Sequence, residues 1–126
     1  MEAKGRLKYC DNHKLIVEID NDFASYYRSL IPKWVAKPNK QRYDTHITVI
    51  RNEIPTNLEC WLKYNGKEII FTYSPDIQTD GVYFWLNVYS TELEEIREEL
   101  GLEKSSEWSR PPDNTECFHI TIGNLK

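Results

Sequence analysis

The tripeptide His-Ile-Thr occurs twice in this chain, at 46–48 and at 119–121. Each copy lies in a run of apolar and β-branched residues, which is typical of a β-strand. Because side chains two residues apart in a strand point to the same face of a sheet, each copy places an imidazole and a hydroxyl side by side. Acid–base cleavage of a phosphodiester requires two such pairs of groups. The candidate catalytic residues are therefore His46, Thr48, His119 and Thr121.

The chemistry follows from these side chains. Histidine has a pKa of about 6.5, so at neutral pH one imidazole can act as a base while another acts as an acid. One would activate a nucleophile and the other would protonate the leaving oxygen. The threonine hydroxyls can donate to non-bridging phosphate oxygens, where negative charge grows in the transition state. The motifs leave open which histidine has which role, and whether water or a ribose 2′-hydroxyl attacks. Attack by the 2′-hydroxyl would make a 2′,3′-cyclic phosphate an intermediate or product.

Two other interpretations of the motifs stay open. In the first, both are ordinary half-buried strands whose histidines have structural hydrogen bonds. In the second, His46, Cys117 and His119 are zinc ligands. The spacing of these three residues matches no usual zinc pattern, and a zinc site would leave both threonines unexplained. We therefore expect no metal and no other cofactor.

Further residues are candidates for binding the substrate. Cationic side chains near the motifs could neutralise phosphate, and aromatic side chains of a predicted strand could stack on a nucleobase. The competing interpretations are a solvated basic loop and packing under a helix. The candidates are Lys40, Arg42, Arg51 and Arg110 among the cations, and Tyr83 and Trp85 among the aromatic residues.

Composition narrows the class of protein. A chain of 126 residues, 40% of them hydrophobic, is expected to form a single domain over 1–126. A net charge of −4 argues against a protein that holds duplex DNA, but not against one that binds a nucleotide in a locally basic cleft. Three widely spaced cysteines fit a reducing cytoplasm better than a disulfide framework. No segment resembles a signal peptide or a membrane span, so we expect a cytoplasmic protein without a membrane partner.

Hydrophobic periodicity predicts the elements that hold the first motif. A hairpin is expected first, followed by an amphipathic helix from Phe23 to Leu30 that Pro32 ends. A basic loop over 32–44 then leads to the motif strand. The expected bounds are 5–10 and 14–19 for the hairpin strands and 45–51 for the motif strand.

The second half repeats this order. Strands are expected at 67–73 and 82–88, and the second motif strand at 117–122. A helix over 91–100 comes between them, with Thr91 and Glu94 as a capping box and Gly101 at its C-terminal end. Alternation over 82–88 predicts one face with Val82, Phe84, Leu86 and Val88 and an opposite face with Tyr83, Trp85, Asn87 and Tyr89. These elements indicate an α+β fold with antiparallel sheets.

The two His-x-Thr motifs, each on a predicted strand, resemble the defining signature of the 2H phosphoesterase superfamily. The resemblance implies bilobal antiparallel β-sheets around a central groove, with two main helices packed outside. It also implies that His46 is the general acid and His119 the general base. The ending from His119 to Lys126, together with the compact size, looks like a small bacteriophage branch of that superfamily that is RNA-repair-like, or LigT-like.

The expected function is that of a metal-independent phosphodiesterase acting on a nucleotide or an RNA end. Its substrate would be a 2′,3′-cyclic phosphate RNA end or a cyclic oligonucleotide; a phage enzyme of the second kind would degrade immune signals of the host. A non-catalytic nucleotide-binding module and a structural or interaction domain are the alternatives. The sequence does not choose the substrate, the oligomeric state, or whether loop 32–44 closes over the ligand.

Overall fold

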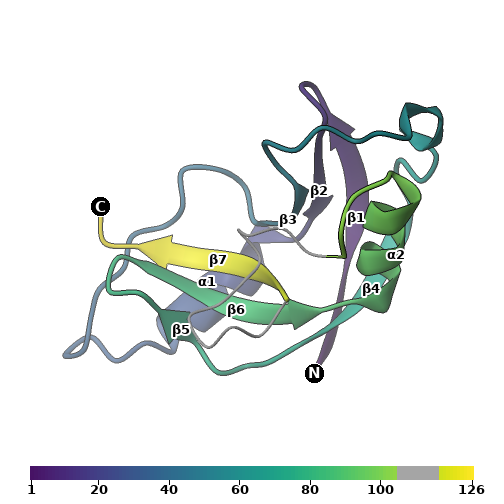
Figure 1. Ribbon diagram of the computed structural model, residues 1–126. Coiled ribbons are helices and arrows are strands. Elements are labelled where there is room, and N and C mark those ends of the chain that lie inside the picture. Colours follow the sequence, from purple (N-terminus) through teal and green to yellow (C-terminus); the bar gives the residue numbers. More distant parts are fainter. Residues whose placement is uncertain (105–116) are drawn as a thin grey trace.

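The computed structural model describes residues 1–104 and 117–126. Each motif strand follows a helix, as the sequence predicts (Figure 1). The elements are β1 (Glu2–Cys10), β2 (Lys14–Glu18), α1 (Asn21–Ser29), β3 (His46–Ile50), a 3₁₀ turn η1 (Leu58–Cys60), β4 (Glu68–Tyr73), β5 (Gln78–Thr79), β6 (Tyr83–Tyr89), α2 (Thr91–Glu99) and β7 (Phe118–Asn124).

The strands of the described residues form one seven-stranded antiparallel sheet in the order β4-β1-β2-β3-β7-β6-β5. β4 also pairs with β6, where Thr72 lies opposite Tyr89 and Tyr73 opposite Val88. This second pairing closes the sheet into a barrel-like ring. The predicted α+β class with antiparallel strands is confirmed. The strands of the two expected lobes are joined by hydrogen bonds into this one sheet, in which the motif strands β3 and β7 are neighbours.

Alternation along the central strands decides which side chains enter the core. Along β6 the predicted inner face is confirmed for Phe84, Leu86 and Val88, which are buried in the core. The prediction is wrong for Val82, which precedes the strand and is 40% exposed. β3 and β7 follow the same rule, so the residues flanking the motif side chains point inward and those side chains lie on the opposite face. The buried residues of these two strands are Ile47, Val49 and Ile50 of β3 and Phe118, Ile120 and Ile122 of β7.

Local signals set the ends of the helices. Asp20 caps α1, where its carboxylate accepts a hydrogen bond from the backbone N–H of Asp22 at 2.9 Å. Ser90 caps α2 through its hydroxyl, which accepts from the N–H of Leu93 at 3.2 Å. The capping box predicted at Thr91 is therefore wrong by one residue. Gly101 follows the last turn with φ +85°, as predicted for a helix end.

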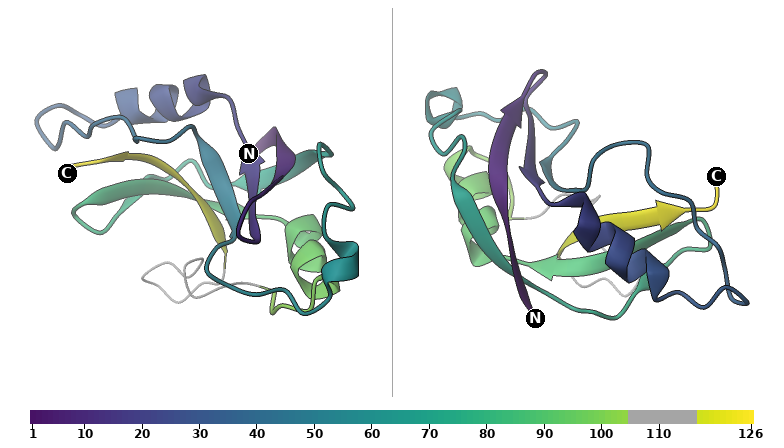
Figure 2. Two further views of the ribbon diagram at one scale, coloured as in Figure 1. Left: turned by 90° about the horizontal axis from the view of Figure 1, so that it is seen from above. Right: turned by 180° about the vertical axis from the view of Figure 1, so that it is seen from behind.

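The two helices lie outside the sheet at separate places, α1 against β7 and α2 near β3 (Figure 2). The acidic side chains of α2 form pairs away from the motif strands. Glu92 binds Lys67 at 2.8 Å, and Glu99 binds Lys63 and the hydroxyl of Tyr64. Among the described residues, no helix has the length and apolar character that crossing a bilayer requires.

A buried arginine ties α2 to the end of β3. Arg97 is 0% exposed. Its guanidinium donates to the carbonyl of Val49 at 2.7 Å and to both carboxylate oxygens of Glu53 at 2.8 Å. Its Nε donates to the carbonyl of Glu103 at 2.7 Å. This fork of charge-assisted hydrogen bonds fixes the chain where it leaves the first motif strand.

Candidate active site

The two motifs meet where β3 and β7 pair. Ile47 of β3 lies opposite Ile120 of β7 in an antiparallel arrangement. The flanking residues of each strand therefore face those of the other, His46 across from Thr121 and Thr48 across from His119. The two motifs are thus related by a local two-fold axis through the isoleucine pair.

A groove of about 810 Å³ runs over these side chains. Its lining residues come from β3, β6 and β7, from the start of β2 and from the loops that border these strands. The described residues that line it are Lys14, Gln41, Tyr43, Asp44, His46, Thr48, Arg51, Asp80, Tyr83, Trp85, Asn87, His119 and Thr121. All four motif side chains therefore face the same open space.

The ring of His46 is oriented by the backbone just before it. Its Nδ1 lies 2.7 Å from the carbonyl oxygen of Asp44. A carbonyl oxygen only accepts hydrogen bonds, so Nδ1 carries the hydrogen and donates it. Nε2 is then the nitrogen left for a ligand, as an acceptor when the ring is neutral and as a donor when it is charged.

His119 has a different environment. Burial lowers the pKa of His119 from its ordinary value, because the charged imidazolium loses solvation, and the positive charge of His46 lowers it further. The neutral ring is therefore favoured at neutral pH. The ring of Trp85 lies beside it, with the ring centroids 6.3 Å apart.

The strands that flank the two motifs break the local symmetry. On the β7 side, Asn87 of β6 lies opposite His119, and Trp85 lies opposite Thr121. On the β3 side, Glu18 of β2 occupies the place opposite His46. The indole N–H of Trp85 donates to Oδ1 of Asn87 at 3.1 Å. One histidine thus has a buried amide and an indole beside it, and the other has an exposed carboxylate.

The sequence comparison agrees with this geometry. The family model described as "Swiss Army Knife, 2H phosphoesterase domain" matches residues 16–126, which include both motifs. The chain belongs to the 2H phosphoesterases. Membership implies an enzyme that hydrolyses phosphoric esters. Comparison with curated proteins and with solved structures finds no match.

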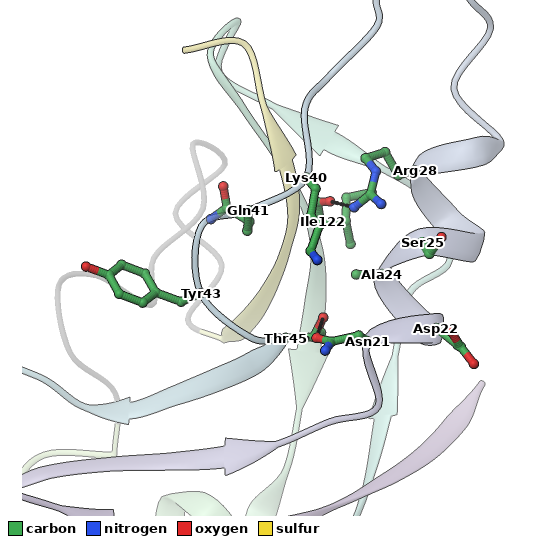
Figure 3. Close-up of a pocket in the computed structure, with 10 residues that line it drawn as sticks. All are labelled: Asn21, Asp22, Ala24, Ser25, Arg28, Lys40, Gln41, Tyr43, Thr45 and Ile122. Carbon is green, nitrogen blue, oxygen red and sulfur yellow. Dashed lines mark hydrogen bonds between the residues drawn. The ribbon is translucent and has the colours of Figure 1, made fainter.

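Three of the predicted substrate-binding residues line the groove of this 2H phosphoesterase, namely Arg51, Tyr83 and Trp85. Lys40 instead lines a smaller cavity of about 180 Å³ beside α1. Figure 3 shows Lys40 directed between its own segment and α1, whereas Tyr43 extends to the opposite side. The structure does not bring Lys40 to the histidines.

Of the two remaining predicted cations, the structure describes Arg42. Arg42 places its guanidinium 5.7 Å from the ring centroid of Tyr43 and lines neither cavity. Arg110 lies outside the residues that the structure describes. Of the predicted cations, the groove thus contains Arg51.

Six lining residues of the 2H phosphoesterase groove were not predicted. Alternation along β6 could have identified Asn87, because it shares a face with Trp85. Lys14 reaches the groove from the start of β2 and the others from turns and loops, and local patterns do not place any of these relative to a distant strand. Asp80 is one of these, and two backbone N–H groups, of Tyr83 and then Val82, lower its pKa and keep it ionised. The remaining ones are Lys14, Gln41, Tyr43 and Asp44.

The zinc hypothesis gains no support from the arrangement of side chains. Over residues 1–104 and 117–126, no group of three or more histidine, cysteine, aspartate or glutamate residues is placed to hold a metal ion. Cys117 is buried in the core at the start of β7.

Proposed function

We propose that this protein hydrolyses a nucleotide phosphodiester without a metal ion, with His119 as the general base and His46 as the general acid. The observation that carries the proposal is the difference between the two imidazoles in one groove. Burial and the neighbouring His46 favour the neutral form of His119, which a base needs. The hydrogen bond from Nδ1 of His46 to the backbone leaves its Nε2 for proton transfer to the substrate.

In the proposed reaction, His119 takes a proton from the attacking hydroxyl as its oxygen bonds to phosphorus. The bond from phosphorus to the leaving oxygen breaks, and His46 delivers its Nε2 proton to that oxygen. After this step His119 carries a proton and His46 has lost one. Proton exchange with water then returns both histidines to their starting forms. Thr48 and Thr121 donate to the non-bridging oxygens and stabilise the charge that gathers there.

The rest of the groove suits a nucleotide. Its volume of about 810 Å³ falls in the usual range of small-molecule sites. Lys14 and Arg51 offer positive charge, and Trp85 offers a half-buried ring on which a base can stack. Tyr83 is less suited to stacking, because the ammonium group of Lys126 lies 4.9 Å from its ring centroid.

The test is a panel of nucleotides assayed in the presence of EDTA. We expect turnover of at least one cyclic nucleotide, undiminished by the chelator, because the proposed proton transfers need no metal. The panel contains 2′,3′-cyclic phosphate RNA ends and cyclic oligonucleotides, with products separated by chromatography. Cleavage of RNA ends would support the RNA-repair-like branch, and cleavage of cyclic oligonucleotides would support a phage enzyme that degrades host signals. Activity that EDTA abolishes would contradict the proposal, and nucleotide binding without any turnover would indicate a binding module.

The dependence of the rate on pH is expected to be bell-shaped. On the acid side, kcat/KM rises as His119 loses its proton, and because the pKa of His119 is lowered, this limb lies below about pH 6.5. On the basic side, the rate falls because the general acid must keep a proton to donate to the leaving oxygen. Initial rates measured across this range check the prediction. An acid limb centred above neutrality, or a monotonic profile, would contradict the assigned roles.

A further inference from the structure

The amide of Asn87 is a buried polar group that the chemistry described so far does not use. Asn87 is only 6% exposed, and it lines the groove from β6. Its Oδ1 accepts the hydrogen bond from the indole N–H of Trp85 at 3.1 Å. Because an indole N–H can only donate, this contact fixes which end of the amide is oxygen and which is nitrogen.

The other end of the amide is left for a ligand. Within residues 1–104 and 117–126, no acceptor takes a hydrogen bond from Nδ2 of Asn87, and this nitrogen is not among the buried polar atoms that lack a partner. It therefore retains contact with the open space of the groove. A ligand in the groove that supplies an acceptor atom can therefore accept a hydrogen bond from this nitrogen.

The position of the Asn87 amide indicates which acceptor atom of a ligand it would contact. Asn87 lies directly opposite His119 in the register of β6 and β7, on the face that also carries Thr121. A phosphate held between the motifs would present a non-bridging oxygen on this side. At the related position beside His46 stands Glu18, whose carboxylate only accepts hydrogen bonds and lies 3.9 Å from the ammonium group of Lys8. Of these two related positions in the flanking strands, the one beside His119 therefore carries a hydrogen-bond donor and the one beside His46 does not.

We propose that Asn87 is a substrate-contacting residue that donates an N–H from Nδ2 to a non-bridging phosphate oxygen beside His119. This inference rests on the proposed function, because it uses the phosphate position that the two motifs define. A donor fixed on a largely buried side chain stabilises the negative charge that grows as the nucleophile attacks. Trp85 acts through Asn87 as a positioning residue, since its indole N–H holds the amide in place.

The test compares Asn87→Ala with the isosteric Asn87→Asp. Loss of one such donor is expected to lower kcat/KM by about 10²–10³-fold in the alanine variant. The aspartate variant keeps an oxygen for Trp85 but replaces the donor with a carboxylate, so the rate falls at least as far. Its acid limb also moves to higher pH, because a carboxylate facing His119 favours the imidazolium. The other ionisable groups of the groove are the same in both variants: Lys14, Asp44, His46, Arg51, Asp80 and Tyr83.

A matched control carries the same charge change outside the groove. In Asn65→Asp, a carboxylate oxygen can still accept the hydrogen bond that the backbone N–H of Tyr9 gives to Asn65 at 3.2 Å. Its kcat/KM and acid limb are expected to match those of the wild type. Thermal unfolding of all variants verifies that they are folded. A rate for Asn87→Ala within about threefold of the wild type, or an unmoved acid limb in folded Asn87→Asp, would overturn the proposal.

A binding measurement separates this inference from the proposed function. The side-chain amide signals of Asn87 in a ¹⁵N–¹H spectrum are followed while inorganic phosphate or adenosine 3′-monophosphate is added to the wild type. We expect both probes to shift these signals. If no nucleotide of the panel is turned over, the proposed function fails, yet the amide shift is still measured. Probes that shift the imidazole signals of the histidines but leave the amide of Asn87 unchanged would overturn the inference alone.

Discussion

Alanine at position 119 or at position 46 is expected to lower kcat by at least about 10²-fold, because each histidine supplies one proton transfer. Nucleotide binding should persist in both variants, since the aromatic and cationic side chains of the groove are unchanged. The loss therefore appears in kcat much more than in KM. Single-turnover rates together with a direct binding measurement separate the two effects.

The double variant decides whether the histidines act as one unit. If both protons move in the same transition state, removing the second imidazole adds little to the loss caused by the first. The third histidine of the chain is a matched control, because His13 lies on the β1–β2 turn with its ring 5.5 Å from that of Trp61 and does not line the groove. His13→Ala should retain the wild-type kcat. A folded His46→Ala or His119→Ala variant with wild-type turnover would refute paired acid–base catalysis.

The local parts of the fold could be predicted because they depend on neighbours in sequence. The alternation of Phe84, Leu86 and Val88 with Tyr83 and Trp85 identified both the strand and its inner face. The position of Gly101 identified the end of α2 for the same reason. The pairing of β4 with β6, which closes the sheet, joins segments whose partners only the whole fold determines.

In the candidate site too, some residues could be predicted from their neighbours in sequence and others depend on the whole fold. Arg51 follows the first motif strand and reaches the groove, so nearness in sequence was sufficient there. Lys40 is also near the motif in sequence, but Asn39 pairs with Asn124 at the end of β7, which directs Lys40 toward α1. Lys14 enters the groove from the start of β2 and Asp80 from the turn before β6, and both positions follow from the closed sheet. Sequence patterns thus identified the catalytic strands but not the loops around them.

Truncation of Arg97 is expected to cause a large loss of stability. Arg97→Ala removes the hydrogen bonds that both carboxylate oxygens of Glu53 accept from the guanidinium. It also removes the donor to the carbonyl of Val49. Breaking such a buried pair by removing one member typically costs about 3–5 kcal/mol. For a small domain this is a large fraction of the free energy of unfolding.

Urea unfolding of two further variants separates the charge effect from simple loss of volume. Arg97→Met fills much of the same space without a charge, and Glu53→Gln in that background removes the stranded carboxylate, so the double variant should recover part of the stability that Arg97→Met loses. Arg6→Ala is the matched control, because its exposed guanidinium makes one hydrogen bond, to the carbonyl of Gly66, and its loss should cost less than about 1 kcal/mol. An Arg97→Ala variant as stable as Arg6→Ala would show that the fork does not hold the end of β3. Arg51 directly follows the last residue of β3 and lines the groove, so its position depends on this end of the strand. Arg97→Ala should therefore also raise KM for the nucleotide under conditions in which the variant is folded.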